Sequence, residues 1–209
     1  MTAHFIHGIR TEITSPVRGL IPYLTDGGFS VAYPDYGFEL EFETRIINPM
    51  IVGTLLPYIQ PGDILIGHSN GCAIAYDLLM AGAPASHGAF INGALETNFP
   101  LPDSLKSLDV YFNSGDDITE AAAIAQRLGW VDKVWGELGH VGYTGKNPRV
   151  TNINCGAARD LPVVSGHSDF FAPAKLLKWG PYLADRLKQA VLKCPVAQSV
   201  NLKPIQTTT

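Results

Sequence analysis

Ser69 lies in a short motif, flanked by glycines, that could make its hydroxyl group a nucleophile. The motif Gly67-His68-Ser69-Asn70-Gly71 follows the apolar run Ile64 to Ile66 and precedes a helix-like stretch from Cys72 to Met80. This pattern predicts a strand, a sharp turn and a helix, with the serine at the apex of the turn. The two glycines lack the Cβ atoms that would collide in so tight a turn. Such a turn exposes the hydroxyl group at the end of the strand and points helix N–H groups toward the same place.

A serine hydroxyl needs a base to take its proton, and the base is usually a histidine held by a carboxylate. In a parallel sheet these groups have to lie near the carboxyl ends of the strands. Four of the six histidines are not expected to serve as the base. His4 and His7 are expected in the first strand, His68 is expected to point away from Ser69, and His87 is expected at the opposite end of the sheet. His167, in the loop before the last helix, is the preferred base, and His140 is the alternative.

The carboxylate is expected between the serine and the histidine along the chain. Asp116 and Asp117 follow a predicted strand, 108–113, and the turn Ser114-Gly115, which places them at the correct end of the sheet. Asp116 is the preferred acid, and Asp117 is then the expected N-cap of the next helix. The two aspartates could exchange these roles, and Glu96, one strand earlier, is a third candidate.

The oxyanion formed when a serine attacks a carbonyl group needs two backbone N–H donors. One is expected from Asn70, the residue after the nucleophile. The other is expected from Ile9, in the loop His7-Gly8-Ile9 after the first strand, where glycine lets the backbone approach a substrate closely. His7 would then brace this loop.

Strand-like and helix-like runs alternate along the chain, which predicts a mostly parallel sheet covered on both faces. The expected strands are 4–7, 30–33, 63–66, 88–92, 108–113 and 131–135. The expected helices are 16–26, 44–59 with a kink near Pro49, 70–80, 118–128 and 173–193, the last broken at Gly180-Pro181. Residues 136–168 are expected to form an irregular or hairpin excursion at the edge of the sheet. The basic residues of the last helix are expected to form a solvated face: Arg186, Lys188 and Lys193.

With these pieces in place, the chain resembles the α/β-hydrolase superfamily from residue 3 to about residue 193. His7-Gly8-Ile9 looks like the oxyanion loop of that family, Gly67 to Gly71 like its nucleophile turn, Ser114-Gly115-Asp116 like its acid turn and Gly166-His167 like its histidine loop. The resemblance implies a compact α/β-hydrolase fold, a three-layer α/β/α sandwich with a mostly parallel central sheet.

The chain also departs from the family that it resembles. It is short, it lacks the early antiparallel strands, and residues 94–106 are the only obvious room for a lid, as in small esterases whose serine is open to solvent. The excursion 136–168 is the expected specificity element. Trp135 and Tyr143 could line an acyl or alcohol pocket there or pack within an edge hairpin.

The resemblance implies a serine hydrolase that cleaves carboxylic esters through Ser69, His167 and Asp116 and an acyl-enzyme intermediate. This chemistry needs neither a metal ion nor an organic cofactor, and the expected partner is a small-molecule ester. Two alternatives stay open: a thioesterase or lipase-like acyl hydrolase, and a non-catalytic ligand-binding scaffold of the same fold.

The composition sets the remaining expectations. A length of 209 residues fits one domain, expected over 1–195, followed by a polar tail, 196–209. The net charge of −4, without a basic stripe, argues against nucleic-acid binding.

Neither a signal peptide nor a membrane-spanning stretch is apparent, and the three scattered cysteines predict no disulfide framework, so a cytoplasmic location is expected. Cys72 is expected to be a small core residue. The oligomeric state stays open.

Overall fold

A parallel sheet of six strands forms the centre of the described part of the chain, which in the computed structural model comprises residues 1–8, 15–36, 44–128 and 135–193. The strands are β1 (Thr2–Ile6), β2 (Ser30–Ala32), β3 (Ile64–His68), β4 (His87–Ile91), β5 (Ser107–Phe112) and β6 (Val150–Asn154). Their order is β2-β1-β3-β4-β5-β6, and every neighbouring pair is parallel. The chain thus builds the sheet first to one side of β1 and then to the other. Ligands of parallel sheets bind beside the carboxyl ends of the strands at such a reversal, and Ser69 follows β3 there.

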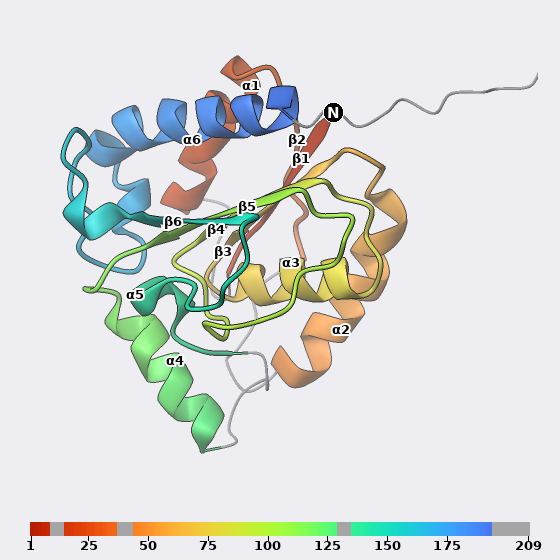
Figure 1. Ribbon diagram of the computed structural model, residues 1–209, viewed down its shortest axis with the longest axis horizontal. Coiled ribbons are helices and arrows are strands. Elements are labelled where there is room, and N and C mark those ends of the chain that lie inside the picture. Colours follow the sequence, from red (N-terminus) through yellow and green to blue (C-terminus); the bar gives the residue numbers. More distant parts are fainter. Residues whose placement is uncertain (9–14, 37–43, 129–134, 194–209) are drawn as a thin grey trace, which may run out of the picture.

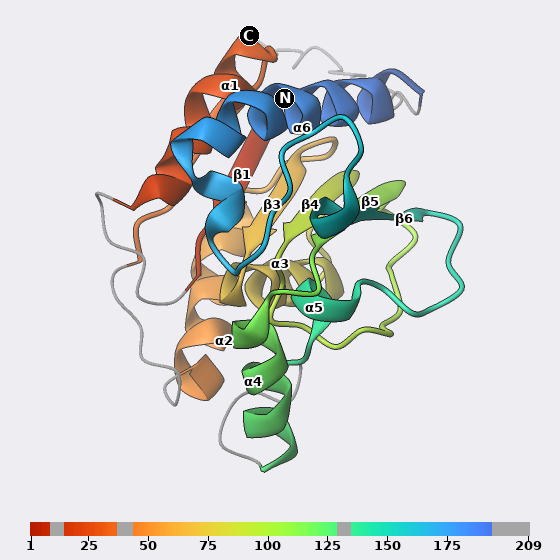
Figure 2. The ribbon, with the colours of Figure 1, turned by 90° about the vertical axis from the view of Figure 1, so that its left-hand side faces the viewer.

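Helices cover both faces of this sheet (Figure 1). On one face lie α1 (Ile21–Asp26) and α6 (Pro173–Lys193), side by side in both views (Figures 1 and 2). On the other face lie α2 (Thr44–Leu55), α3 (Asn70–Met80), α4 (Asp117–Arg127) and α5 (Leu138–Val141). Short 3-10 turns add η1 (Pro16–Leu20), η3 (Leu56–Tyr58), η4 (Cys155–Ala157) and η5 (Asp169–Phe171). The predicted three-layer sandwich with a parallel sheet is confirmed.

Two apolar cores join the three layers. Side chains alternate between the faces along β3, so that Ile64 and Ile66 belong to the core under α6, together with Trp179, while Leu65 belongs to the core over α3, together with Leu78. All five side chains are buried. A central parallel strand is covered on both faces, which is why this segment of the sequence is an unbroken apolar run.

The last helix differs from its prediction, because α6 continues through Gly180 and Pro181. A Cβ atom on Gly180 would lie 2.5 Å from the Tyr23 ring of α1, so glycine permits close packing of the two helices here rather than ending one of them. The neighbouring Trp179 is fully buried. Tertiary packing therefore keeps the helix intact although proline is unfavourable inside it.

The edge of the sheet and the basic face of α6 also differ from their predictions. Residues 136–168, expected to form an irregular or hairpin excursion, contain β6, which pairs in parallel with β5 as a sixth parallel strand. Arg186 is not simply solvated, because its guanidinium group donates two hydrogen bonds of 2.7 Å to the Asp109 carboxylate of β5. The side chain is partly buried in this ion pair.

Other boundaries move by a few residues. The segment predicted as helix 16–26 begins with η1, and that predicted as helix 44–59 ends its α-helical part at Leu55. The predicted strand 131–135 and tail 196–209 lie outside the described residues, except for Trp135, which is not in a strand. Within the described residues, no helix has the length and apolar character needed to cross a membrane.

Candidate active site

Ser69 occupies the strained turn that the sequence predicts between β3 and α3. Its backbone has φ 57° and ψ −128°, a region that L-residues rarely occupy and that persists only when the surroundings impose it. A Cβ atom on Gly67 would lie 2.7 Å from Cys72 Cα, and one on Gly71 would overlap the carbonyl oxygen of Ile6. Glycine is therefore required on both sides of the turn.

The structure brings Ser69, His167 and Asp116 into one chain of hydrogen bonds. The His167 Nε2 atom lies 2.8 Å from Ser69 Oγ. The His167 Nδ1 atom lies 2.9 Å and 3.0 Å from the two carboxylate oxygens of Asp116. A carboxylate can only accept, so Nδ1 carries a proton and, in the neutral ring, Nε2 is left to accept the serine proton.

Asp116 is also the N-cap of α4, a role that was expected of Asp117. Its Oδ1 atom accepts a hydrogen bond of 3.2 Å from the backbone N–H of Thr119. Asp117 is instead the first residue of the helix and is exposed. Glu96, the third candidate acid, is exposed and lines a separate surface hollow with Arg127.

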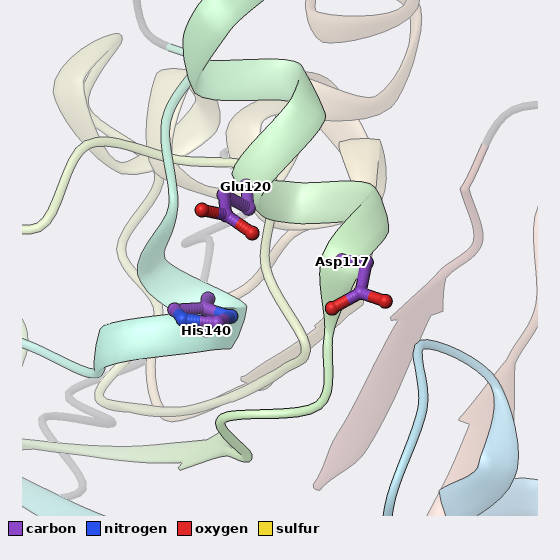
Figure 3. A group of neighbouring side chains, drawn as sticks. All are labelled: Asp117, Glu120 and His140. Atoms are coloured by element: carbon purple, nitrogen blue, oxygen red, sulfur yellow. The ribbon is translucent and has the colours of Figure 1, made fainter.

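His140, the alternative base, lies on α5 and faces α4 (Figure 3). Potential ligand atoms of His140, Asp117 and Glu120 lie within 4.8 Å of one another, which makes them the group of described residues that could hold a metal ion. The two carboxylates are exposed in the first turn of α4, where negatively charged side chains also stabilise the helix by interacting with its dipole. Gly139 packs beside the candidate acid, since a Cβ atom there would lie 2.5 Å from Asp116 Oδ2.

The loop after β1 passes directly beside the serine. Ile9, the expected donor to an oxyanion, lies outside the described residues, but its neighbour Gly8 is described. A Cβ atom on Gly8 would lie 2.7 Å from Ser69 Cβ and 3.1 Å from its Oγ. The backbone at this loop therefore reaches the nucleophile, and only glycine allows that approach.

His7 contacts this loop through its side chain. Its Nδ1 atom lies 2.8 Å from the Gly8 carbonyl oxygen, and its ring stacks on Tyr36, with ring centroids 3.9 Å apart. Burial lowers the pKa of His7, which favours the neutral ring. The carbonyl oxygen can only accept, so the neutral ring carries its proton on Nδ1. These are the contacts expected of a residue that braces the loop.

Asn70, the other expected oxyanion donor, has its side chain locked by partners that the sequence analysis missed. Asn48 of α2 and Asn70 exchange two amide hydrogen bonds of 3.0 Å each, and Trp135 Nε1 donates to Asn70 Oδ1 at 2.8 Å. Trp135 is buried in this arrangement, and the buried Tyr143 donates a hydrogen bond of 3.2 Å to the carbonyl oxygen of Phe99. These contacts favour the packed alternative for both aromatic residues over an exposed pocket lining.

His68 does not point away from the site as expected. Its ring lies 5.0 Å from that of His167, and its Nε2 atom lies 3.4 Å from the His167 carbonyl oxygen. Burial lowers the pKa of His68 well below its ordinary value, and the nearby His167 lowers it further. His68 therefore stays neutral at neutral pH and places no second positive charge beside the candidate base.

Two asparagines at strand ends were also missed. Asn92 follows β4 and Asn113 follows β5, both are buried, and both donate from their side-chain amides to the loop that carries His167. The available signal was an amide side chain directly after each of two predicted strands. Cys72, by contrast, behaves as predicted: it is fully buried behind the turn, and burial raises the pKa of its thiol.

Comparison with known proteins identifies the fold. No protein-family model and no curated protein sequence matches the chain. A dienelactone hydrolase-like promiscuous phosphotriesterase from metagenomic libraries is similar in structure, with a TM-score of 0.50, 13% identity, and coverage of 92% of this chain and 85% of that one. A YdeN-like hydrolase from Pectobacterium atrosepticum (TM-score 0.47, 14% identity, 90% and 91% covered) and a pyrethroid hydrolase from Sphingobium faniae (0.47, 13%, 93% and 98%) also match. The chain has an α/β-hydrolase fold.

Proposed function

We propose that the protein is a serine hydrolase that cleaves carboxylic esters, with Ser69 as nucleophile, His167 as base and Asp116 as the acid that orients the base. The observation that carries this proposal is the position of His167, which lies 2.8 Å from Ser69 Oγ through one ring nitrogen and 2.9 Å from Asp116 through the other. A nucleophile within hydrogen-bond reach of a base, itself oriented by a carboxylate, is the arrangement that activates a serine.

The first half of the reaction forms an acyl-enzyme. Ser69 Oγ attacks the ester carbonyl carbon while its proton passes to His167 Nε2, and the Asp116 carboxylate stabilises the resulting imidazolium ion. The carbonyl oxygen becomes an oxyanion, for which the backbone N–H groups of Asn70 and Ile9 are the proposed donors. Collapse of this intermediate breaks the bond to the alcohol oxygen, which leaves with the proton of His167.

The second half returns the enzyme to its starting state. His167 Nε2 takes a proton from water, and the oxygen of that water attacks the acyl carbon. Collapse of the second tetrahedral intermediate releases the carboxylic acid and returns the proton to Ser69 Oγ. Each step uses only the three side chains and backbone N–H groups.

The strained turn supports this proposal independently of the hydrogen bonds. A serine that merely linked β3 to α3 would gain nothing from φ 57° and ψ −128°. Strain of this kind costs on the order of 1–3 kcal/mol and is found where it serves a site. The close approach of Gly8 to Ser69 supplies backbone beside the nucleophile, as the proposed oxyanion stabilisation requires.

A fluorophosphonate probe, which labels activated serines, tests the proposal directly. We expect the native protein to be labelled, and labelling to be lost in Ser69→Ala and in His167→Ala. His140→Ala is the matched control and should be labelled like the native protein. Labelling that survives His167→Ala but not His140→Ala would move the base to His140. A folded native protein that is not labelled would contradict the proposed chemistry and favour a ligand-binding scaffold.

The substrate class is tested next with p-nitrophenyl esters of increasing acyl length and with the corresponding thioesters. We expect hydrolysis of the esters by the native protein and none by Ser69→Ala. A clear preference for thioesters would replace the ester proposal with the thioesterase alternative, and a rise in activity with long acyl chains would favour a lipase-like enzyme.

A further inference from the structure

Two backbone carbonyl groups of the histidine loop converge on one buried amide. The Asn92 Nδ2 atom lies 2.5 Å from the carbonyl oxygen of His167 and 3.3 Å from that of Gly166. Carbonyl oxygens only accept hydrogen bonds, so the amide nitrogen, and not the amide oxygen, has to face them. The amide nitrogen thus donates to the residue that carries the candidate base and approaches the residue before it.

A second amide extends this contact to the turn that carries the candidate acid. Asn113 Nδ2 donates to Asn92 Oδ1 at 3.2 Å and approaches the Gly166 carbonyl oxygen at 3.5 Å. Asn113 Oδ1 accepts a hydrogen bond of 3.1 Å from the backbone N–H of Gly115, directly before Asp116. The two amides therefore connect the loop of the base to the turn of the acid, across the ends of β4 and β5.

The backbone around these asparagines is adapted to this contact. Asn92 has φ 44°, in the left-handed region, which asparagine tolerates better than most residues, and its backbone N–H donates to the Tyr111 carbonyl oxygen at 2.9 Å. A Cβ atom on Gly115 would lie 2.6 Å from the Ser165 carbonyl oxygen, so the acid turn and the histidine loop already touch there.

Regular structure does not hold the histidine in place. Residues 162–168 form neither helix nor strand, so side-chain contacts add to the few backbone hydrogen bonds of this loop, such as that from the Val164 N–H to the Cys155 carbonyl oxygen at 3.0 Å. On the outer side, Asp169 accepts hydrogen bonds from the backbone N–H and the hydroxyl group of Ser165. On the inner side, the neutral His68 ring adds a contact to those of the two buried amides, because its Nε2 atom lies 3.4 Å from the His167 carbonyl oxygen.

We propose that Asn92 and Asn113 are positioning residues that fix His167 between Asp116 and Ser69. This inference rests on the proposed function, because it assigns these residues to the same reaction. Both side chains are buried, so an oxygen in place of either donating nitrogen would face acceptor oxygens in a place that water does not easily reach. Displacement of a catalytic group by about 1 Å can lower a rate on the order of 100-fold.

Asn92→Asp and Asn113→Asp test the proposal, because each keeps the shape of the side chain and replaces the donating amide nitrogen with an oxygen. Aspartate also tolerates the left-handed backbone at position 92. Ser107→Ala is the control: it removes the hydrogen bond of 2.9 Å to His87, at the opposite end of the sheet from Ser69. For each protein, kcat and KM for a p-nitrophenyl ester, the thermal unfolding midpoint, and the downfield proton resonance of an imidazole N–H bonded to a carboxylate are measured.

We expect both asparagine variants to lose kcat by on the order of 100-fold while KM stays within about twofold, the pattern of a lost transition-state interaction. The resonance of the His167 Nδ1 proton, identified by its absence in His167→Ala, should weaken or shift in both variants and persist in Ser107→Ala. Folded variants with native kcat and an unchanged resonance would overturn the proposal. So would a loss of kcat in Ser107→Ala as large as theirs.

The resonance keeps this test separate from that of the proposed function. If the native protein proves not to hydrolyse esters, a resonance that is lost in both variants still supports the positioning role, and one that persists overturns it. If Asn92→Asp does not fold, Asn113→Asp decides alone, because it keeps the acceptor for the Gly115 N–H while an oxygen replaces the donating nitrogen.

Discussion

Asp116 combines two roles that the sequence analysis divided between neighbouring residues. Its carboxylate accepts from the Thr119 N–H at the start of α4 and also contacts His167 Nδ1. Its side chain is completely buried, so the helix that it caps also fixes the carboxylate in space. At the scale of single residues, one carboxylate therefore both caps a helix and orients the candidate base.

Asp116→Asn separates these two roles. Asparagine caps helices as well as aspartate does, so we expect the urea midpoint of unfolding to change little. The amide can offer an N–H to His167 Nδ1 and favour the wrong tautomer, so kcat should fall by roughly 10⁴-fold. Asp117→Asn is the control and should retain native kcat. Equal effects of the two variants on kcat would refute the assignment of Asp116 as the acid.

At the scale of elements, the ion pair between Arg186 and Asp109 joins α6 to β5. The hydrogen bonds from Arg186 to the Asp109 carboxylate raise the pKa of the guanidinium group, although burial opposes this. Asp109 is buried in the sheet, whereas about a third of the Arg186 side chain is exposed. The pair therefore satisfies a carboxylate that the sheet would otherwise leave unpaired.

Arg186→Met removes the partner of that carboxylate. We expect the free energy of unfolding to fall by about 2 kcal/mol, less than for a fully buried pair because solvent screens Arg186. The double variant with Asp109→Leu should recover most of the loss, since no unpaired charge is then buried. Urea unfolding gives the free energy of unfolding of the native protein, of Arg186→Met and of the double variant. Lys188→Met, at an exposed residue of the same helix, is the control. No difference between Arg186→Met and Lys188→Met would show that the pair contributes nothing.

At the scale of the whole molecule, the fold buries three histidines in places that favour their neutral form. Burial is the largest cause of the lowered pKa of His7, His68 and His87. The unfolded chain takes up protons at these residues below a pH of about 6.5, where the folded protein resists protonation. The unfolded state then binds more protons, so the free energy of unfolding decreases as the pH falls through this range.

Urea unfolding between roughly pH 8 and pH 5 tests this dependence. We expect little change above about pH 7 and a decline below about pH 6.5, with each histidine contributing at most about 1.4 kcal/mol per pH unit. His87→Leu, far from Ser69, should make the decline less steep. A free energy of unfolding that stays constant down to about pH 5.5 would contradict the burial of neutral histidines.

Much of the fold was predictable because the relevant signals are local. The apolar run 64–66 and the glycines on either side of Ser69 specify a strand and a tight turn through backbone sterics alone. Alternation of strand-like and helix-like runs then predicts a parallel sheet with two covered faces, which is confirmed. Chain order pointed to Asp116 and His167, and the structure places His167 beside Ser69 and Asp116 beside His167, where their catalytic roles are proposed.

The sequence by itself thus determined the turn at Ser69, the order of strands and helices as far as α4, and the shortlist of reactive residues. Only the tertiary structure decided that α6 continues through Pro181, that Arg186 pairs with Asp109, that Asp116 caps α4, and that Asn92 reaches the loop of His167. The physical reason is that sterics and periodicity act between neighbours along the chain. The contact between Asn92 and His167 joins residues 75 positions apart and forms only when the strands, helices and loops have packed together.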